Sequence, residues 1–158
     1  MSDEGIGAYL NPAQMSKLNR LALKGVDAYE MIRRSVLNSR VIGTDETGMN
    51  VNGKKYWFWT WQNQQATFIA ASTNRGTATI DEHANGIYPD AVLVHDCWKA
   101  HFQTAVNKHQ LCTAHLERET KYLQERYKVA WPGRFRVMLM EAQKLKKQLS
   151  PADYDYPT

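Results

Sequence analysis

Apolar and polar positions alternate with a helical period through the first forty residues. Asn11-Pro12 has the form of an N-cap followed by proline in the first helical turn, and the helix that begins there is predicted to end at Gly25. A second helix is predicted from Asp27, which stands at capping-box spacing from an acidic residue, to about Ser39. The N-terminal segment is therefore expected to be helical.

The pattern then changes to that of extended strands. Residues 40–46 (RVIGTDE) have no helical rhythm, and residues 54–62 (KKYWFWTWQ) alternate between two faces. Asn52-Gly53 lies between them and is a strong hairpin signal, because both residues tolerate a positive φ. With a further strand over 66–72, these segments predict a three-stranded antiparallel meander.

The alternation places Trp57, Trp59 and Trp61 on one face of the middle strand. Packing in the core under a helix is the favoured interpretation of such a row. A stacking platform for unpaired bases is the alternative.

The second half of the chain mixes short apolar runs with amphipathic segments. Trp131-Pro132-Gly133 is expected to separate the last two helices, and Asn74-Arg75-Gly76 forms either a plain turn or a contact with a nucleic-acid backbone. The predicted helices span 77–84, 98–106, 114–127 and 134–149, and the predicted strands span 91–95 and 110–112.

This element order is that of a ribonuclease H-like α/β core, in which the first and fourth strands lie side by side and parallel. Three regions follow: an N-terminal helical segment over 1–39, the core over 40–127, and the start of a helical insertion over 128–158. Ser150-Pro151 has the form of a new helix start close to the last residue, so we expect a fragment truncated at its C-terminus.

Charge is distributed unevenly along the chain. Residues 1–98 hold nine basic and ten acidic groups (9 − 10 = −1), whereas residues 99–148 hold eleven basic and four acidic groups (11 − 4 = +7). This concentration favours a polyanionic partner, and a solvated helical surface is the plainer alternative. The sequence has no apolar run long enough for a membrane span and no secretory signal, so a cytoplasmic, nucleoid-associated protein without a membrane partner is expected.

Two aspartates are the strongest candidates for chemistry. Asp45 lies within the first predicted strand, where an acid is disfavoured unless something binds it, and Asp96 follows the apolar run of the fourth. The proposed topology brings them together, and paired carboxylates suit a hard divalent cation with open positions for phosphate and water. A turn or N-cap role is the alternative for Asp96.

Four short sequence motifs support this interpretation. They are residues 45–48 (DETG), 51–54 (VNGK), 92–98 (VLVHDCW) and 112–119 (CTAHLERE). In order and separation they resemble the motifs of bacterial insertion-sequence transposases of the IS-sixty-six type, where they are close to DETG, VNGK, HDGW or HDxW, and CxAHLxRE. The resemblance covers roughly residues 35–126.

The resemblance implies a DDE transposase catalytic domain. Asp45 and Asp96 would be its first two catalytic, metal-binding acids, holding Mg²⁺ or Mn²⁺ in a two-metal site. The implied activity is DNA strand cleavage and strand transfer at element ends, by a homo-oligomer assembled on DNA. His115, Arg118 and Glu119 would belong to the neighbourhood of the site, next to the metal ligands or the phosphate.

The third acid of the family is where the match ends. In the family it lies beyond the helical insertion, in an Asn-rich stretch that this sequence lacks. Glu117 and Glu119 are nearer carboxylates but fall in the helix after Cys112, and Glu46 should point away from Asp45 within one strand. Because the third carboxylate is missing, this polypeptide is expected to be inactive by itself.

The remaining candidates are basic or zinc-type residues. Cys112-x-x-His115 has a zinc-like spacing, but a structural role is favoured over zinc because four ligands are not evident. Basic side chains that follow the second acid are the candidates for binding DNA phosphates: Lys121, Arg126, Lys128, Arg134 and Arg136.

Two rival functions remain. A ribonuclease H-like nuclease needs the same acids without strand transfer. A non-catalytic remnant would bind nucleic acid only, without the third acid.

Overall fold

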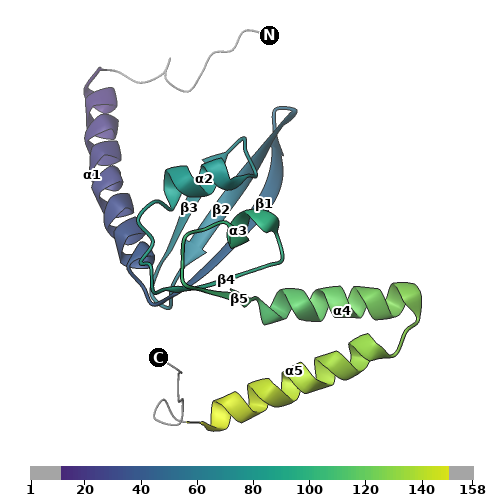
Figure 1. The fold of residues 1–158 in the computed structure, drawn as a ribbon. Helices are drawn as coiled ribbons and strands as arrows, with labels where there is room; N and C mark the ends of the chain where they lie inside the picture. Colours follow the sequence, from purple (N-terminus) through teal and green to yellow (C-terminus); the bar gives the residue numbers. More distant parts are fainter. Residues whose placement is uncertain (1–11, 150–158) are drawn as a thin grey trace.

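A five-stranded mixed sheet forms the body of the protein. The computed structural model describes residues 12–149, and its strands run in the order β3-β2-β1-β4-β5 (Figure 1). The bounds are β1 Val41–Val51, β2 Lys54–Gln62, β3 Thr67–Ser72, β4 Val92–His95 and β5 Lys108–Leu111. The first three strands are antiparallel neighbours, whereas β4 pairs parallel with β1 and β5 pairs parallel with β4. This is the predicted ribonuclease H-like topology.

The β1–β2 hairpin turns where the sequence indicates. Asn52 and Gly53 both have positive φ, 50° and 76°, which suits the right-handed twist of the flanking strands. Val51 pairs with Lys54 directly at the turn, so β1 extends five residues beyond the predicted end at residue 46. The added residues 47–51 (TGMNV) include a glycine and an asparagine, which are uncommon in strands, so the sequence pattern does not identify them as strand.

A single helix, α1 (Pro12–Leu37), replaces the two predicted N-terminal helices. The prediction that Gly25 ends a helix was wrong. A glycine stops a helix by adopting a positive φ, and Gly25 is not among the described residues that do so. A Cβ atom added at residue 25 would meet no atom within 4 Å, so no close contact requires glycine there. The helix continues through Gly25 at the usual cost in helix propensity. The predicted N-cap, Asn11, lies outside the described residues.

The C-terminal half of α1 packs against the body of the protein, where the Tyr29 hydroxyl donates to the Ile69 carbonyl oxygen of β3 at 3.2 Å. Val36 and Leu37 are buried, and the Arg33 guanidinium donates to the carbonyl oxygens of His83 and Asn85. Leu23 and Met31 are exposed, and the N-terminal half of the helix projects away from the sheet (Figure 1).

The tryptophan face of β2 forms the core, as predicted. Trp59 and Trp61 are buried and stacked on each other at 5.9 Å, and Trp61 also stacks on Phe68 of β3. Ile80 of α2 (Thr77–His83) and Ala100 of α3 (Lys99–Phe102) belong to the same cluster. Burial of both rings excludes the alternative in which they stack on unpaired bases.

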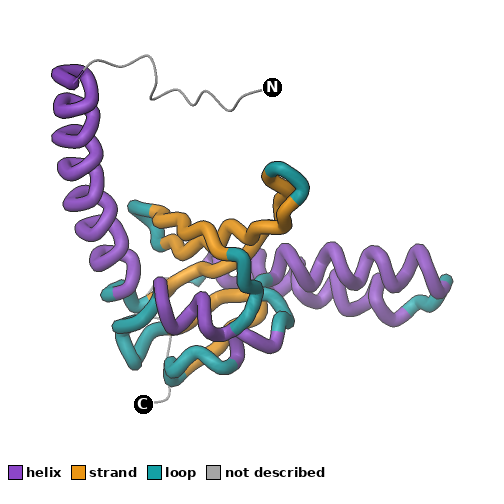
Figure 2. Tube along the Cα trace, turned by 90° about the horizontal axis from the view of Figure 1, so that it is seen from above, coloured by secondary structure: helices purple, strands orange, loops and turns teal. Residues whose placement is uncertain are grey.

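Helices α4 (Thr113–Tyr127) and α5 (Trp131–Gln148) form a hairpin that extends away from the sheet (Figures 1 and 2). The chain breaks at Lys128, which has φ 53°, rather than across residues 131–133. Those residues begin α5 instead, because proline suits the first helical turn. The two helices of the hairpin pack against each other, and Met138 and Leu145 of α5 are exposed.

Two short elements differ from their predicted bounds. Helix α3 ends at Phe102 rather than 106, and β5 begins at Lys108 rather than 110. Among the described residues, no helix has the length and apolar character needed to cross a bilayer.

Candidate active site

Strand register brings the two aspartates together. In the parallel β1–β4 pair, Ile42 stands opposite Leu93 and Gly43 opposite Val94. Asp45 and Asp96 each lie two residues beyond that last pair, so both carboxylates emerge at the same edge of the sheet. Neighbouring parallel strands hold ligands in this way at the carboxyl ends of α/β sheets.

His115 completes a cluster with these acids. One ligand atom from each of Asp45, Asp96 and His115 lies within 4.8 Å of the other two, and His115 Nε2 is 3.7 Å from Asp45 Oδ2. His115 stands in the first turn of α4, directly after β5, which places it beside the sheet edge. The side chains of Asp45 and His115 are 49% and 24% exposed, so the cluster is open to a ligand from solvent.

Local hydrogen bonds orient both carboxylates. The backbone N–H of Glu46 donates to Asp45 Oδ1 at 2.9 Å, and that of Trp98 donates to Asp96 Oδ1 at 2.9 Å. Each carboxylate keeps a second oxygen for another partner. Carboxylate oxygens are the ligands that Mg²⁺ and Mn²⁺ prefer, so Asp45 and Asp96 fit the expected ion. His115 Nδ1 is buried and has no hydrogen-bond partner among the described residues.

Glu46 faces the opposite side of the sheet from Asp45, as strand alternation predicts. It stands opposite the buried Trp59 in the β1–β2 register, and its side chain is only 1% exposed. Burial acts to raise the pKa of Glu46, but hydrogen bonds from His101 and Arg75 outweigh it and hold that pKa below its usual value. Asp96 lies between the faces, since Glu46, Asp96 and His101 form a second group with ligand atoms within 4.8 Å.

His101 and Arg75 were not identified as site residues from the sequence. Arg75 was interpreted only within the segment 74–76, as part of a plain turn or of a contact with a nucleic-acid backbone. A buried acid in a strand requires a partner. That signal was present at Glu46, but nothing local indicates which distant residues supply the partners.

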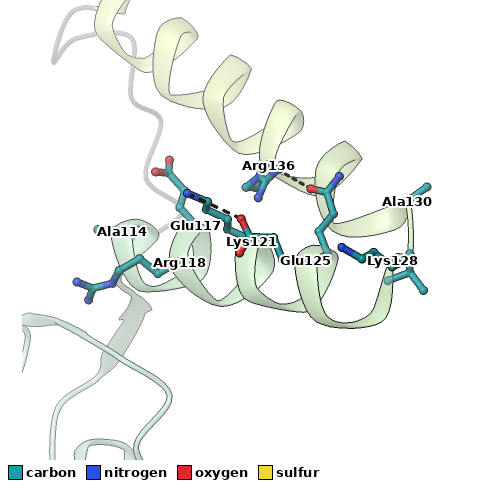
Figure 3. A pocket seen from close by; sticks show the side chains of 10 residues that line it. Ala114, Glu117, Arg118, Lys121, Glu125, Lys128, Ala130 and Arg136 are labelled. Carbon is teal, nitrogen blue, oxygen red and sulfur yellow. Dashed lines mark hydrogen bonds and ion pairs between the residues drawn. The ribbon is translucent and has the colours of Figure 1, made fainter.

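The residues expected near the site separate into two places. Arg118 lies in α4 one turn beyond His115 and lines a groove of about 970 Å³ between α4 and α5 (Figure 3). Neither Glu117 nor Glu119 belongs to either of the potential metal-ligand groups among residues 12–149. Glu117 also lines the groove, whereas Glu119 and Asp96 add to burial in raising the pKa of the Cys97 thiol.

The candidate DNA-contacting residues lie on the helical hairpin. Lys121, Lys128 and Arg136 line the groove, where Lys121 is 4.0 Å from Glu125 and Arg136 donates to the Gln124 side chain (Figure 3). Arg126 and Arg134 are exposed outside the groove lining.

No cysteine belongs to either potential metal-ligand group in the described part of the chain. Cys97 is exposed and Cys112 is partly buried, and both are free thiols.

His95 links the second aspartate to the neighbouring strand. It is fully buried, and its Nδ1 contacts the Asp96 carbonyl oxygen. A carbonyl only accepts, so Nδ1 carries the proton and neutral His95 accepts at Nε2 from His109 Nδ1, 2.9 Å away. Burial is the main cause that lowers the pKa of His95 below 6.5, and His101 and His109 contribute to the lowering.

We expect this histidine to make the fold acid-sensitive. Because its pKa is lower in the folded state, the free energy of unfolding is full above pH 6.5 and falls as pH drops below that value. The loss cannot exceed about 1.4 kcal/mol per pH unit for one proton. Thermal unfolding between pH 7.5 and 5 should show a smaller slope for His95→Gln than for the wild type. Equal slopes for wild type and His95→Gln would contradict the assignment.

Two solved structures are similar to part of the chain. The chain is 10% identical to a chain of the simian T-cell lymphotropic virus intasome in complex with PP2A regulatory subunit B56 gamma, with a TM-score of 0.40, and the match covers 60% of this chain and 45% of that one. It is 13% identical to the HTLV-2 integrase catalytic core domain in complex with magnesium, with a TM-score of 0.39, and this match covers 60% of the chain and 78% of the core domain. The chain thus spans less than half of the intasome chain that it matches.

A search among curated proteins finds no match. The sequence model of the transposase IS66 family matches residues 6–155. This range is nearly the whole chain and includes both aspartates and all four sequence motifs. The chain belongs to the transposase IS66 family.

Proposed function

We propose that this chain is the catalytic region of a DDE transposase that cleaves and joins DNA at element ends, with Asp45 and Asp96 as the ligands of Mg²⁺ or Mn²⁺. The observation that carries the proposal is the convergence of Asp45, Asp96 and His115 within 4.8 Å at an open sheet edge. A two-metal site there would stabilise the attacking and leaving oxygens of phosphoryl transfer.

The chain's own residues prepare the site. The backbone N–H groups of Glu46 and Trp98 each bind one oxygen of an aspartate, so the second oxygen of each carboxylate could bind a metal ion. His115 lies close enough to Asp45 to limit the orientations of its carboxylate. Such preorganisation lowers the cost of bringing the groups into a reactive arrangement.

Two phosphoryl transfers make up the proposed reaction. In the first, a water oxygen bonds to phosphorus as the bridging P–O3′ bond breaks, which releases a 3′-hydroxyl and a 5′-phosphate. In the second, that 3′-hydroxyl oxygen bonds to a target phosphorus as the target's own P–O3′ bond breaks. The number of phosphodiester bonds is conserved in the second step.

A cleavage assay tests the function. Labelled DNA carrying an element end, incubated with the protein and Mg²⁺ or Mn²⁺, should yield a nicked end, and a pre-cleaved end should yield a strand-transfer product. Cleavage without transfer would favour the ribonuclease H-like nuclease. DNA binding without cleavage and without calorimetric Mn²⁺ binding would favour the non-catalytic remnant, which gains support because neither Glu117 nor Glu119 joins the described ligand groups.

The helical hairpin is the proposed DNA-binding surface. Residues 113–148, which form the hairpin, carry a net charge of +5 (9 − 4), and Arg118 connects this surface to the acids because it lies one turn from His115. The surface would follow the DNA backbone, with no sequence preference of its own. We further expect that the protein binds DNA as a homo-oligomer, which sedimentation of the complex with an element end would measure.

The double variant Arg118→Gln/Lys121→Gln should weaken DNA binding and its salt dependence. Removing two phosphate contacts is expected to reduce the slope of log K against log salt by about 1.8. Fluorescence anisotropy with a labelled duplex between 50 and 300 mM salt measures that slope. Lys144→Gln/Lys147→Gln removes the same charge from α5 outside the groove lining and serves as the matched control. Equal losses in both variants would show that net charge alone binds DNA.

A further inference from the structure

Behind the aspartates, on the tryptophan face of the sheet, lies a compact polar cluster. Glu46 Oε1 accepts from Arg75 Nε at 2.8 Å and lies 2.7 Å from Nη2, while its Oε2 accepts from His101 Nε2 at 2.9 Å. The side chains of Glu46 and His101 are each 1% exposed. A buried carboxylate is costly unless it is paired and hydrogen-bonded, and here both of its oxygens are used.

The cluster reaches Asp96 first through His101. Its Nε2 lies 2.9 Å from Glu46 and 3.6 Å from Asp96 Oδ1, so the imidazole stands between the two carboxylates. The ring is held in that place by an edge contact with Trp59, with centroids 5.6 Å apart. A change at Glu46 would release the ring that lies against the second aspartate.

The second connection runs through Arg75 and Trp98. The Arg75 guanidinium lies over the Trp57 ring at 4.5 Å and over the Trp98 ring at 3.9 Å. The Arg75 carbonyl oxygen accepts from Trp98 Nε1 at 3.2 Å, and the Trp98 backbone N–H donates to Asp96 Oδ1 at 2.9 Å. Glu46 therefore fixes the position of Arg75, and Arg75 in turn contacts Trp98. The backbone N–H of Trp98 orients the Asp96 carboxylate.

Glu46, Asp96 and His101 form the second potential ligand group, but they are poorly arranged to bind a metal ion of their own. The nitrogen of His101 that faces both carboxylates donates its proton to Glu46, so it offers no lone pair to a cation. Its other nitrogen, Nδ1, is buried and has no hydrogen-bond partner among the described residues. The Arg75 charge next to Glu46 also opposes a cation there.

We propose that Glu46 is a positioning residue, which fixes the Asp96 carboxylate through His101 and through Arg75 and Trp98. The consequence for metal binding rests on the proposed function, whereas the consequence for the conformation of residues 96–102 does not. Partners that hold metal ligands in place commonly change metal affinity by roughly 10- to 100-fold when they are removed.

The test compares Glu46→Gln with the wild type in two measurements. Backbone amide exchange over residues 96–102 should become at least about tenfold faster, because His101 and Trp98 lose their common anchor. The dissociation constant for Mn²⁺, measured calorimetrically with MnCl₂ alone, should rise by roughly 10- to 100-fold. Glutamine keeps the size of the side chain and removes its charge.

Three further variants make the result specific. Arg75→Lys keeps the charge but loses the planar fork and the stacking, so it should give a smaller change in the same direction. Lys55→Gln removes the other cation over Trp57, at 4.5 Å, without touching Glu46, and should leave both measurements unchanged. Phe68→Leu destabilises the core at β3, where Trp61 and Trp59 separate Phe68 from His101, and should leave Mn²⁺ affinity unchanged, which separates positioning from a general loss of stability.

Wild-type amide exchange and wild-type Mn²⁺ affinity in Glu46→Gln would overturn the proposal. If near-ultraviolet circular dichroism shows that Glu46→Gln does not fold, Arg75→Lys decides with the same two measurements. Absence of Mn²⁺ binding by the wild type would refute the proposed metal site, and the amide exchange of residues 96–102 would then decide on Glu46 alone.

Discussion

Asp45→Asn is expected to abolish metal-dependent DNA cleavage while leaving DNA affinity equal or higher. The amide has the same size but lacks the anionic oxygens that a divalent ion requires, and it replaces a proposed ligand rather than a residue behind one. The rate should therefore fall by more than about 100-fold, the upper end of the losses seen when outer partners are removed. The fold should be retained, because this side chain is half exposed and outside the core.

DNA affinity should respond in the opposite direction, because removing a negative charge reduces repulsion of the phosphates. Anisotropy with uncleaved duplex measures binding, and gel analysis of labelled element ends measures cleavage in Mg²⁺ and in Mn²⁺. Glu82→Gln removes the same charge from an exposed site on α2 and should preserve cleavage. Wild-type cleavage by Asp45→Asn would remove this residue from the mechanism.

The pairing of Asp45 with Asp96 could be predicted because it depends on few features. An apolar run before Asp96, a hairpin signal after Asp45 and the order of elements determine that β1 and β4 are parallel neighbours, and the register then aligns residues 45 and 96. The tryptophan row was equally accessible, because strict alternation indicates one buried face. Both predictions use patterns that are complete within short segments.

The network around Glu46 depends on contacts that no short segment contains. Arg75 and His101 are 29 and 55 residues from Glu46, and neither lies in a pattern that indicates a partner. Strand alternation correctly placed Glu46 on the other face of the sheet from Asp45, and Glu46 was therefore excluded as a metal ligand. Alternation does not show which residues a buried carboxylate contacts. Long-range charge pairing therefore required the three-dimensional arrangement.

Predictions of helix boundaries were wrong where a residue type can either end a helix or form part of one. Gly25 and the residues 131–133 were interpreted as helix breakers, yet a glycine with helical φ continues a helix and a proline in the first turn begins one. The helix actually ends at Lys128, which adopts a left-handed conformation. Lysine rarely takes this conformation, so the residue type does not indicate a helix end there.

Trp59→Ala is expected to cost roughly 3 to 5 kcal/mol of unfolding free energy. The side chain is fully buried, stacks on Trp61 and makes a T-shaped contact with His101. Its Nε1 also donates to the Asn74 carbonyl oxygen at 3.2 Å, which would lose that donor. The melting temperature should fall by roughly 6 to 20 °C for a chain of this size.

The comparison with Trp131→Ala separates core packing from surface effects. Trp131 is 50% exposed at the start of α5, so the same substitution there should cost less than about 1 kcal/mol. Chemical denaturation of both variants measures the difference, and anisotropy with single-stranded DNA measures any stacking on bases. A small stability loss for Trp59→Ala combined with weaker single-strand binding would place this ring on a nucleic-acid surface and contradict the packing of the core. Because the Trp59 ring also supports His101, a large stability loss should be accompanied by faster amide exchange near Asp96.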